Sequence, residues 1–424
     1  MTVGLPGTPA GIPPGSPAGR NENTPNGGAP PGDAHHGNTP DGRAPNGDAP
    51  NRGGATRAPD LADLGDGADA GPPGPDVRRR RRAVLALAGL AAGVLVMFVV
   101  AVAVGSVRVP LDETVRALTG ADPHDPRWGV IVRQIRLPRA ITAALAGAAL
   151  SVAGLQMQTL FRNPLADPYS LGVSAGASLG VAVVVAGISA GGGTFTAGAA
   201  GASRLGMVAA GAIGAAAVLA VILVLARWVR SVVTLLVIGV VLSSAVSSLV
   251  SLMLAWTAPQ RAQQYWVWQL GSFSGTSLGD LTVFAPVVGL GLAGALASVK
   301  PLNALLLGEG YARTMGVRVR RIRALTLVGA SLLAGGVTAF CGPVAFLGIT
   351  VPHVARRLLA TSDHRFLMPG ALLTGALVAL ACSVVAQLPG TDLLLPINIV
   401  TSLIGAPIVI AVLLRARTNV AGVA

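Results

Sequence analysis

Apolar residues form ten long runs between residue 83 and the C-terminal region. Most runs approach the roughly 20 residues that a helix needs to cross the hydrocarbon core of a bilayer. The pattern predicts an all-α polytopic membrane protein with ten transmembrane helices, near residues 83–105, 139–160, 171–190, 205–226, 232–256, 280–299, 324–341, 343–358, 367–387 and 397–414. Only Gly342-Pro343 separates the seventh helix from the eighth, so it must form their turn.

A polar connection joins the second and third predicted helices. It carries Arg162, Asn163 and Asp167, and it is interrupted by Pro164 and Pro168, neither of which continues a helix. In a bilayer, irregular backbone persists only at the surface, or where protein or a water-filled path covers it. This connection is therefore typical of a membrane transport subunit.

Composition agrees with a polytopic membrane protein. Hydrophobic residues make up 52% of the chain, charged residues only 12%, and the mean hydropathy is +0.65. The 56 glycines indicate closely packed membrane helices with small residues at their contacts. Residues 1–77 differ, because they are rich in Gly, Pro, Asn and Asp and offer little to bury, so we expect a disordered tail. We expect the permease domain at 78–417 and a short C-terminal tail at 418–424.

The net charge of +13 is explained by membrane topology rather than by nucleic-acid binding. Five arginines, 78–82, precede the first helix and place that end in the cytoplasm, so ten crossings put both termini there. The loops assigned to the cytoplasm carry Arg162, Arg227, Arg230, Lys300, Arg313, Arg318, Arg320, Arg321, Arg323, Arg356, Arg357, Arg365, Arg415 and Arg417. The first outside loop, 106–138, is the exception, with Arg108, Arg116, Arg127, Arg133 and Arg136. Lys300 is the only lysine, which indicates a GC-rich genome and a bacterial plasma membrane.

The chain lacks the residues that usually power transport. Ion-coupled carriers place acidic residues, histidine or lysine within the membrane, whereas the predicted helices hold almost no acidic residue beyond Asp280. For His353, which follows Pro352, a backbone-bonded role is favoured over a proton relay. A P-loop requires a Gly-Lys-Ser/Thr sequence, but Lys300 is followed by Pro301. We therefore expect no catalytic residue, no metal site and no cofactor on this chain, with ATP and Mg²⁺ bound by a partner.

One cytoplasmic loop is suited to docking such a partner. Residues 302–317 are amphipathic and carry Gly308 and Gly316 around a short predicted helix that begins near Glu309, where the helix dipole favours an anion. Helical spacing places Ala312 and Met315 on one face, with Arg313 off it. We expect the backbones to approach closely at the small residues of this loop.

Several motifs together carry a family resemblance. They are Arg136-Leu-Pro-Arg139, Gly147-Ala-Ala-Leu-Ser-Val-Ala-Gly154, Arg162-Asn-Pro-Leu-Ala-Asp-Pro168, Leu171-Gly-Val-Ser-Ala-Gly-Ala177, Leu307-Gly-Glu-Gly-Tyr-Ala-Arg-Thr-Met-Gly316, Gly342-Pro-Val-Ala-Phe-Leu-Gly348, Pro352-His-Val-Ala-Arg356, Asp363-His-Arg365 and Gly405-Ala-Pro407. In this order and at these spacings, the chain from Arg136 to Arg415 resembles FecCD-type permeases of ABC importers for iron chelates, haem and cobalamin. Two positions depart from the family pattern: Gln387 where an outer arginine is common, and Leu394-Leu-Pro-Ile-Asn398 before the last helix.

The resemblance implies a homodimer, or a heterodimer with a similar chain, around a central path, with two ATPase subunits and an extracytoplasmic binding lipoprotein. It implies that Gly308, Glu309, Ala312, Arg313 and Gly316 couple to the ATPase, and that Arg127 and Arg139 dock the binding protein. The translocation or structural motif comprises Arg162, Asn163, Pro164, Pro168, Gly172, Pro352 and His353. Ferric siderophore is the expected cargo, because it is the commonest in this family. Cobalamin and haem are the alternatives within it, and an ion-coupled secondary carrier is the alternative outside it.

Overall fold

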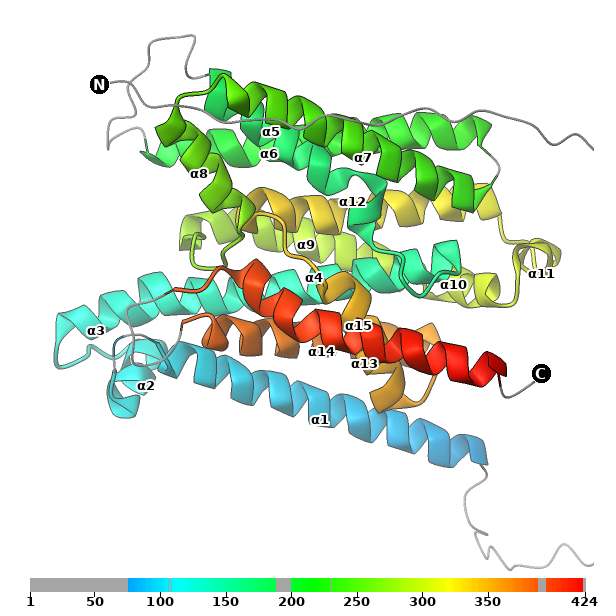
Figure 1. The fold of residues 1–424 in the computed structure, drawn as a ribbon. Coiled ribbons are helices and arrows are strands. Elements are labelled where there is room, and N and C mark those ends of the chain that lie inside the picture. Colours follow the sequence, from blue (N-terminus) through cyan, green and yellow to red (C-terminus); the bar gives the residue numbers. More distant parts are fainter. Residues whose placement is uncertain are drawn as a thin grey trace, which may run out of the picture. The chain divides into compact units, whose positions relative to one another are not determined.

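The computed structural model describes residues 75–105, 107, 109–187, 200–229, 231–387 and 394–421. Every described element is helical, and the long helices lie side by side (Figure 1). Residues 1–74 of the expected N-terminal tail lie outside the described residues, whereas residues 75–77 already belong to the first helix. The expected C-terminal tail is helical as far as Ala421.

All ten apolar runs are helices, as predicted. They are α1 (Pro75–Ala103), α4 (Leu137–Phe161), α5 (Val173–Gly187), α6 (Ala200–Trp228), α7 (Val232–Ala255), α9 (Leu278–Ala297), α12 (Val319–Cys341), α13 (Leu347–Leu359), α14 (His364–Val385) and α15 (Ile397–Ala421). Within the described residues, seven helices are long and apolar enough to cross a membrane, and α5 and α15 have shorter apolar stretches. Helix α13 has 13 residues, a rise of roughly 20 Å, so it is shorter than a bilayer core.

Several shorter helices were not predicted. They are α2 (Leu111–Thr119), α3 (Pro126–Val130), the π-helix η1 (Ile131–Arg136), the 3₁₀ helix η2 (Pro168–Leu171), α8 (Pro259–Gln269) and α10 (Val299–Leu306). The short helix predicted near Glu309 is present as α11 (Glu309–Thr314). The second predicted helix, near 139–160, begins earlier than expected, because helix runs without a break from Pro126 to Phe161. Pro138 lies inside this continuous helix, two residues after the π-helix η1, whose wider turn departs from the i→i−4 bonding that a proline interrupts.

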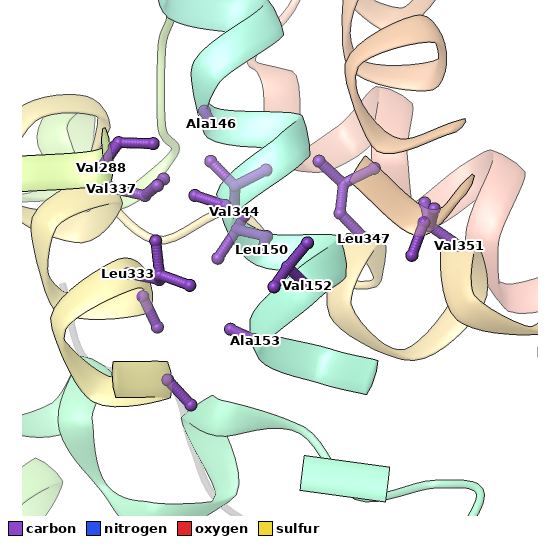
Figure 2. Packing of buried hydrophobic residues seen from close by; sticks show 14 of the residues in the cluster. Ala146, Leu150, Val152, Ala153, Val288, Leu333, Val337, Val344, Leu347 and Val351 are labelled. Atoms are coloured by element: carbon purple, nitrogen blue, oxygen red, sulfur yellow. The ribbon is translucent and has the colours of Figure 1, made fainter. Parts of the chain in front are cut away.

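Helix α4 forms the centre of the bundle. It packs against α14, α12, α13 and α9, and most of its side chains are buried. Figure 2 shows Leu150 and Val152 among side chains of the neighbouring helices, with Val288 of α9 and Leu333 of α12 on one side and Leu347 of α13 on the other. This surrounded position explains why α4 is apolar on every face.

Glycines permit the closest helix contacts around α4. A Cβ atom on Gly154 would overlap the carbonyl group of Gly348, and one on Gly147 would overlap the carbonyl of Gly375 in α14. The contact is mutual, because a Cβ on Gly375 would overlap the carbonyl of Gly147. The small-residue packing expected from the composition is therefore present at the contacts of α4 with α13 and α14.

Candidate functional site

The polar connection after α4 is an ordered turn. Arg162 ends the helix in the left-handed conformation, with φ of 48°, and its Nη2 donates to the carbonyl of Leu305 in α10 at 3.1 Å. The side-chain oxygen of Asn163 accepts from the Leu165 backbone N–H at 2.9 Å. Asp167 caps the start of η2 by accepting from the Tyr169 N–H. Burial raises the pKa of this carboxyl to about 6, against the opposing effect of that hydrogen bond.

Helix α13 holds the other side of the same turn. His353 Nε2 lies 2.9 Å from the carbonyl of Pro164; because a carbonyl only accepts, Nε2 carries the proton. The backbone-bonded role expected for His353 is therefore what the structure contains. Pro352 and Pro168 are buried, and Gly172 ends η2 with φ of 84°. These motif residues attach the end of α4 to α10 and α13.

Helix α11 begins at Glu309, as predicted, and one of its contacts was not expected. The Glu309 carboxylate pairs with Arg323 of α12 at 2.7 Å and with Arg313 at 3.5 Å. Gly308 and Gly316 flank the helix with φ values of 121° and 81°, which only glycine adopts readily. Backbone conformation is therefore sufficient to explain both glycines without close contact to a partner.

The prediction that Ala312 faces a partner was wrong. Its side chain is 0% exposed and packs within this chain, whereas Met315 is 60% exposed. The two residues therefore do not share an accessible face. Tyr311 is 56% exposed, and the Arg313 side chain is 69% exposed. Gly310 and Thr314 are exposed as well. The large side chains on the accessible surface of α11 are Tyr311, Arg313 and, directly after the helix, Met315.

A buried polar network missed by the sequence analysis connects α10 with α14 and α4. Asn303 of α10 donates to Asp363 at 2.6 Å, and its oxygen accepts from His364 Nδ1 at 2.7 Å. The other ring nitrogen of His364 lies 2.9 Å from the Thr159 hydroxyl of α4. The only sequence signal was the Asp363-His-Arg365 motif, which gave no indication that Asn303 was its partner. These bonds link α10 to the start of α14 and, through His364, to α4.

The two arginines expected at the outer face differ sharply. Arg127 lies on α3 with its side chain 87% exposed, 3.8 Å from Asp125. Arg139 is only 6% exposed, and its Nη2 donates to the carbonyl of Ala101 in α1 at 3.2 Å. The prediction of Arg139 as a docking residue was wrong, because its guanidinium group is turned into the bundle to bond the end of a helix.

Arg136 has the same structural role and was not singled out from the sequence. It is 2% exposed, and its Nη1 donates to the carbonyls of Val102 and Ala103, at 3.1 and 2.6 Å. Its Nη2 donates to the carbonyl of Val107. The last carbonyls of a helix have no partner within the helix, so Arg136 and Arg139 together cap the C-terminus of α1.

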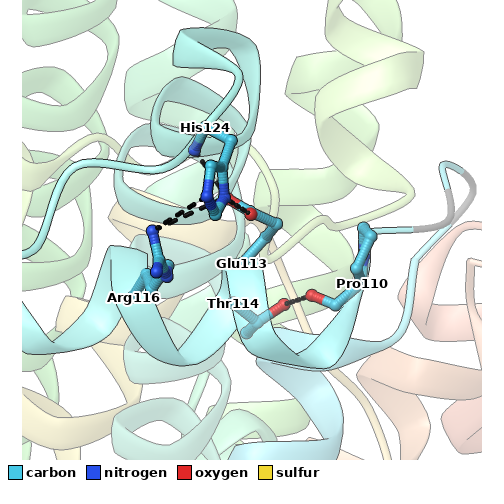
Figure 3. A network of polar contacts seen from close by, with 5 residues as sticks. All are labelled: Pro110, Glu113, Thr114, Arg116 and His124. Atoms are coloured by element: carbon cyan, nitrogen blue, oxygen red, sulfur yellow. Dashed lines mark hydrogen bonds and ion pairs between the residues drawn. The ribbon is translucent and has the colours of Figure 1, made fainter.

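Helix α2 and the segment before α3 are held together by polar contacts (Figure 3). Glu113 is 5% exposed, and its carboxylate lies 2.6 Å from His124 Nδ1 and accepts from the His124 backbone N–H at 3.0 Å. Arg116 Nη1 lies 3.4 Å from the same ring. Arg133 donates to the carbonyl of Ala117 at 2.8 Å. Arg133 therefore braces this region, while Arg127 and Arg116 remain exposed.

A row of exposed hydroxyl groups runs along α7. The serines at 244, 247, 248 and 251 follow the i, i+3, i+4, i+7 spacing of one helix face, and all four are exposed. Three of their hydroxyls donate to carbonyls one turn earlier, which leaves their oxygen lone pairs outward. The sequence already contained this spacing, although the row was not recognised. An otherwise apolar membrane helix thus presents one polar face.

Comparisons with known proteins agree on one family. The FecCD transport family matches residues 76–415. A permease of Bacillus subtilis, YvrB, is 35% identical over 76% of this chain and 90% of its own length. The hemin transport permease HmuU of Yersinia pestis is 32% identical over 78% and 97%. The vitamin B12 import permease BtuC of Escherichia coli is 34% identical over 71% and 88%.

A solved structure supports the same assignment. An ABC transporter assigned to the metal-chelate type, in an inward-facing conformation, matches with a TM-score of 0.67 and 28% sequence identity. The match covers 78% of this chain and 98% of that one. This chain is therefore a membrane-spanning permease subunit of the FecCD transport family of ABC importers.

Proposed function

We propose that this permease imports a ferric siderophore, as one of two permease subunits around a central path. The similarity to a metal-chelate type transporter supports a chelate as the cargo. The observation that carries the proposal is the serine face of α7, because a polar chelate needs hydrogen-bonding groups along its route through an apolar bilayer. The second subunit would face these serines across the path.

Two helix substitutions test this path. Ser244→Leu with Ser248→Leu replaces two hydroxyls by apolar groups on the serine face, and Ala245→Leu adds similar bulk to an exposed position off that face. We expect the double variant to reduce uptake at least severalfold at equal membrane abundance, and Ala245→Leu to leave it near wild type. If the double serine variant transports as well as Ala245→Leu, the translocation path does not run along the serine face of α7.

We further propose that ATPase subunits dock on the accessible surface of α11 at Tyr311, Arg313 and Met315. Movement of α11 would pass to α12 through the pair between Glu309 and Arg323. It would pass to α4 through α10, because Arg162 bonds the carbonyl of Leu305. Tyr311→Ala with Met315→Ala should reduce ATPase co-purification, while permease abundance and thermal stability stay unchanged. Full ATPase retention would remove α11 from the docking surface.

The proposed topology places both termini in the cytoplasm. Figure 1 supports it, because α11 lies at the same end of the bundle as the start of α1, and α2 and α3 lie at the opposite end. The start of α1 carries the exposed residues Arg80, Arg81 and Arg82, as the positive-inside rule requires. Arg127 would then face the extracytoplasmic binding protein. Labelling of single cysteines placed at Arg127 and Arg365 from either side of the membrane tests this orientation.

Haem and cobalamin are the competing cargoes, because the relatives HmuU and BtuC carry the names of hemin and vitamin B12 systems. Uptake of radiolabelled ferric siderophore, hemin and cobalamin should be compared in a deletion strain with and without this gene. We expect restored uptake of the ferric siderophore alone. Restoration of hemin or cobalamin uptake instead would reject the siderophore and keep the importer.

A further inference from the structure

A cavity at the arginine-rich end of α6 and α12 combines strong positive charge with an apolar wall. Its volume is about 930 Å³. Five arginines line it, and Glu309 is the one carboxylate among the described residues that do so. The arginines are 227, 313, 318, 320 and 323. Even with Glu309 ionised, an excess of positive charge remains, and an anionic ligand would balance it.

The apolar wall continues along the same two helices. Helix α6 contributes Leu223 and Ala226 to the basic cavity, and α12 contributes Ala324 and Leu327. A second cavity, of about 1070 Å³, follows further along, lined by Leu219 and other residues of α6 and by Val328 and other residues of α12. The second cavity is also lined by α9 and its N-cap, among them Ser277, Asp280 and Val283. Its lining residues Leu219 and Val328 lie within one helical turn of Leu223 and Leu327 of the basic cavity, on two helices that pack against each other. The two cavities therefore lie end to end along α6 and α12, and we refer to them together as the groove.

The dimensions of this groove match one leaflet of a bilayer. From Arg320 to Leu332, which lines the second cavity, α12 rises roughly 18 Å, whereas half of the hydrocarbon core is roughly 15 Å thick. A ligand with its anionic group among the arginines would therefore extend its apolar part to about the middle of the membrane. A soluble anion would use the arginines and leave the apolar groove unoccupied.

We propose that this groove is a binding site for an anionic phospholipid, with the phosphate among the arginines and an acyl chain between α6 and α12. Guanidinium groups form bidentate hydrogen bonds with phosphate oxygens. An acidic surface of a partner protein would match the arginines but not the apolar groove beyond them. Because Glu309 and Arg313 also line the cavity, the headgroup lies beside α11. An effect of the lipid on coupling to the ATPase would rest on the proposed docking of the ATPase at α11. Binding of the lipid to the groove does not depend on that proposal.

The test measures lipid binding to the full-length permease by native mass spectrometry in detergent. Phosphatidylglycerol is titrated against phosphatidylcholine with the same acyl chains. The groove variant combines Arg227→Gln, Arg318→Gln and Arg320→Gln, all exposed residues that line the cavity. The matched control combines Arg321→Gln, Arg357→Gln and Arg365→Gln, which remove the same charge from exposed residues outside it.

We expect the groove variant to bind phosphatidylglycerol about 100-fold more weakly, at about fivefold per arginine, and the control to stay within about threefold of wild type. Equal losses in both variants would mean non-specific attraction and overturn the proposal. If the groove variant still binds phosphatidylglycerol but no longer co-purifies with the ATPase, these arginines contact the ATPase. That result would also overturn the lipid proposal.

A second arm separates a lipid from free phosphate. Ala324→Trp fills the apolar wall at an exposed position and leaves the arginines in place. We expect it to weaken phosphatidylglycerol binding about tenfold, and excess inorganic phosphate to leave the lipid bound to the wild type. Displacement by phosphate, with unchanged binding to Ala324→Trp, would show that the site takes a phosphate anion and not a lipid.

Discussion

Replacing Arg136 tests whether buried arginines hold the end of α1. Its guanidinium donates to the carbonyls of Val102, Ala103 and Val107, and Arg136→Met leaves all three without this donor. Hydrogen bonds between membrane helices are worth roughly 0.6–2 kcal/mol each, and bonds from a charged donor lie at the upper end. Desolvation of the buried guanidinium offsets part of what the three bonds contribute. We therefore expect Arg136→Met to lower the free energy of unfolding by about 3 kcal/mol.

The chain provides its own reporter for this measurement. Cys341 and Cys382 are its only cysteines; neither forms a disulfide, and both are buried, at 3% and 1% exposure. A maleimide that fluoresces on thiol reaction therefore reports unfolding during a temperature ramp in detergent. A loss of about 3 kcal/mol should lower Tm by roughly 5–10 °C on the scale of soluble domains. Arg136→Lys should recover part of the loss, since an ammonium group reaches fewer of the carbonyls.

Arg127→Met is the matched control. This side chain is 87% exposed and only weakly paired, so its removal should change the free energy of unfolding by less than about 0.5 kcal/mol. It should instead slow association with the binding protein at low ionic strength. A Tm for Arg136→Met equal to that of Arg127→Met would refute the capping argument.

The remaining predictions use the same thermal assay. Ser151→Ala should lower the free energy of unfolding by about 1 kcal/mol, because its hydroxyl donates to the Ala371 carbonyl at 2.8 Å. Ser331→Ala should cost nothing, since its buried hydroxyl has no hydrogen-bond partner among the described residues. The raised pKa of Asp167 means that the folded state holds this proton more tightly, so its contribution to stability falls between about pH 4 and pH 6 and is level above that range. Asp167→Asn should remove that part of the pH dependence, and an unchanged pH profile would contradict the raised pKa. Ala312→Trp should lower Tm by several degrees, because the site is fully buried; an unchanged Tm would return Ala312 to an accessible face.

The ten apolar helices could be predicted because the bilayer imposes a length. A run near 20 apolar residues has few alternatives to spanning, and even the least distinct pair, on either side of Gly342-Pro343, is separated as expected. Helices α2 and α8 carry no such length signal, because they are short and polar on average. Helix α2 is held instead by side-chain contacts outside the helix, such as the one between Glu113 and His124.

Side-chain direction accounts for the errors at the candidate sites. A sequence shows that Arg139 lies near the end of a membrane helix, but does not show whether the guanidinium points to water or to the carbonyls of α1. The same applies to Ala312, where helical spacing gave a face but not what that face contacts. In both cases a residue expected at the surface is buried, and its contacts within the chain account for the residue type without a partner protein.

The positive-inside rule rests on a cost that is separate from the contacts each arginine makes in the folded chain. Moving any guanidinium across a bilayer costs desolvation energy, so arginines collect on one side regardless of their later contacts. On that side, Arg162 and Arg323 are bonded within the chain, to Leu305 and Glu309, whereas Arg320 is exposed and lines the basic cavity. Counting them predicts a topology, but only their contacts separate the arginines that fix the helices from those left to meet a ligand. The exposed arginines of the groove are therefore where substitution should change binding without changing the fold.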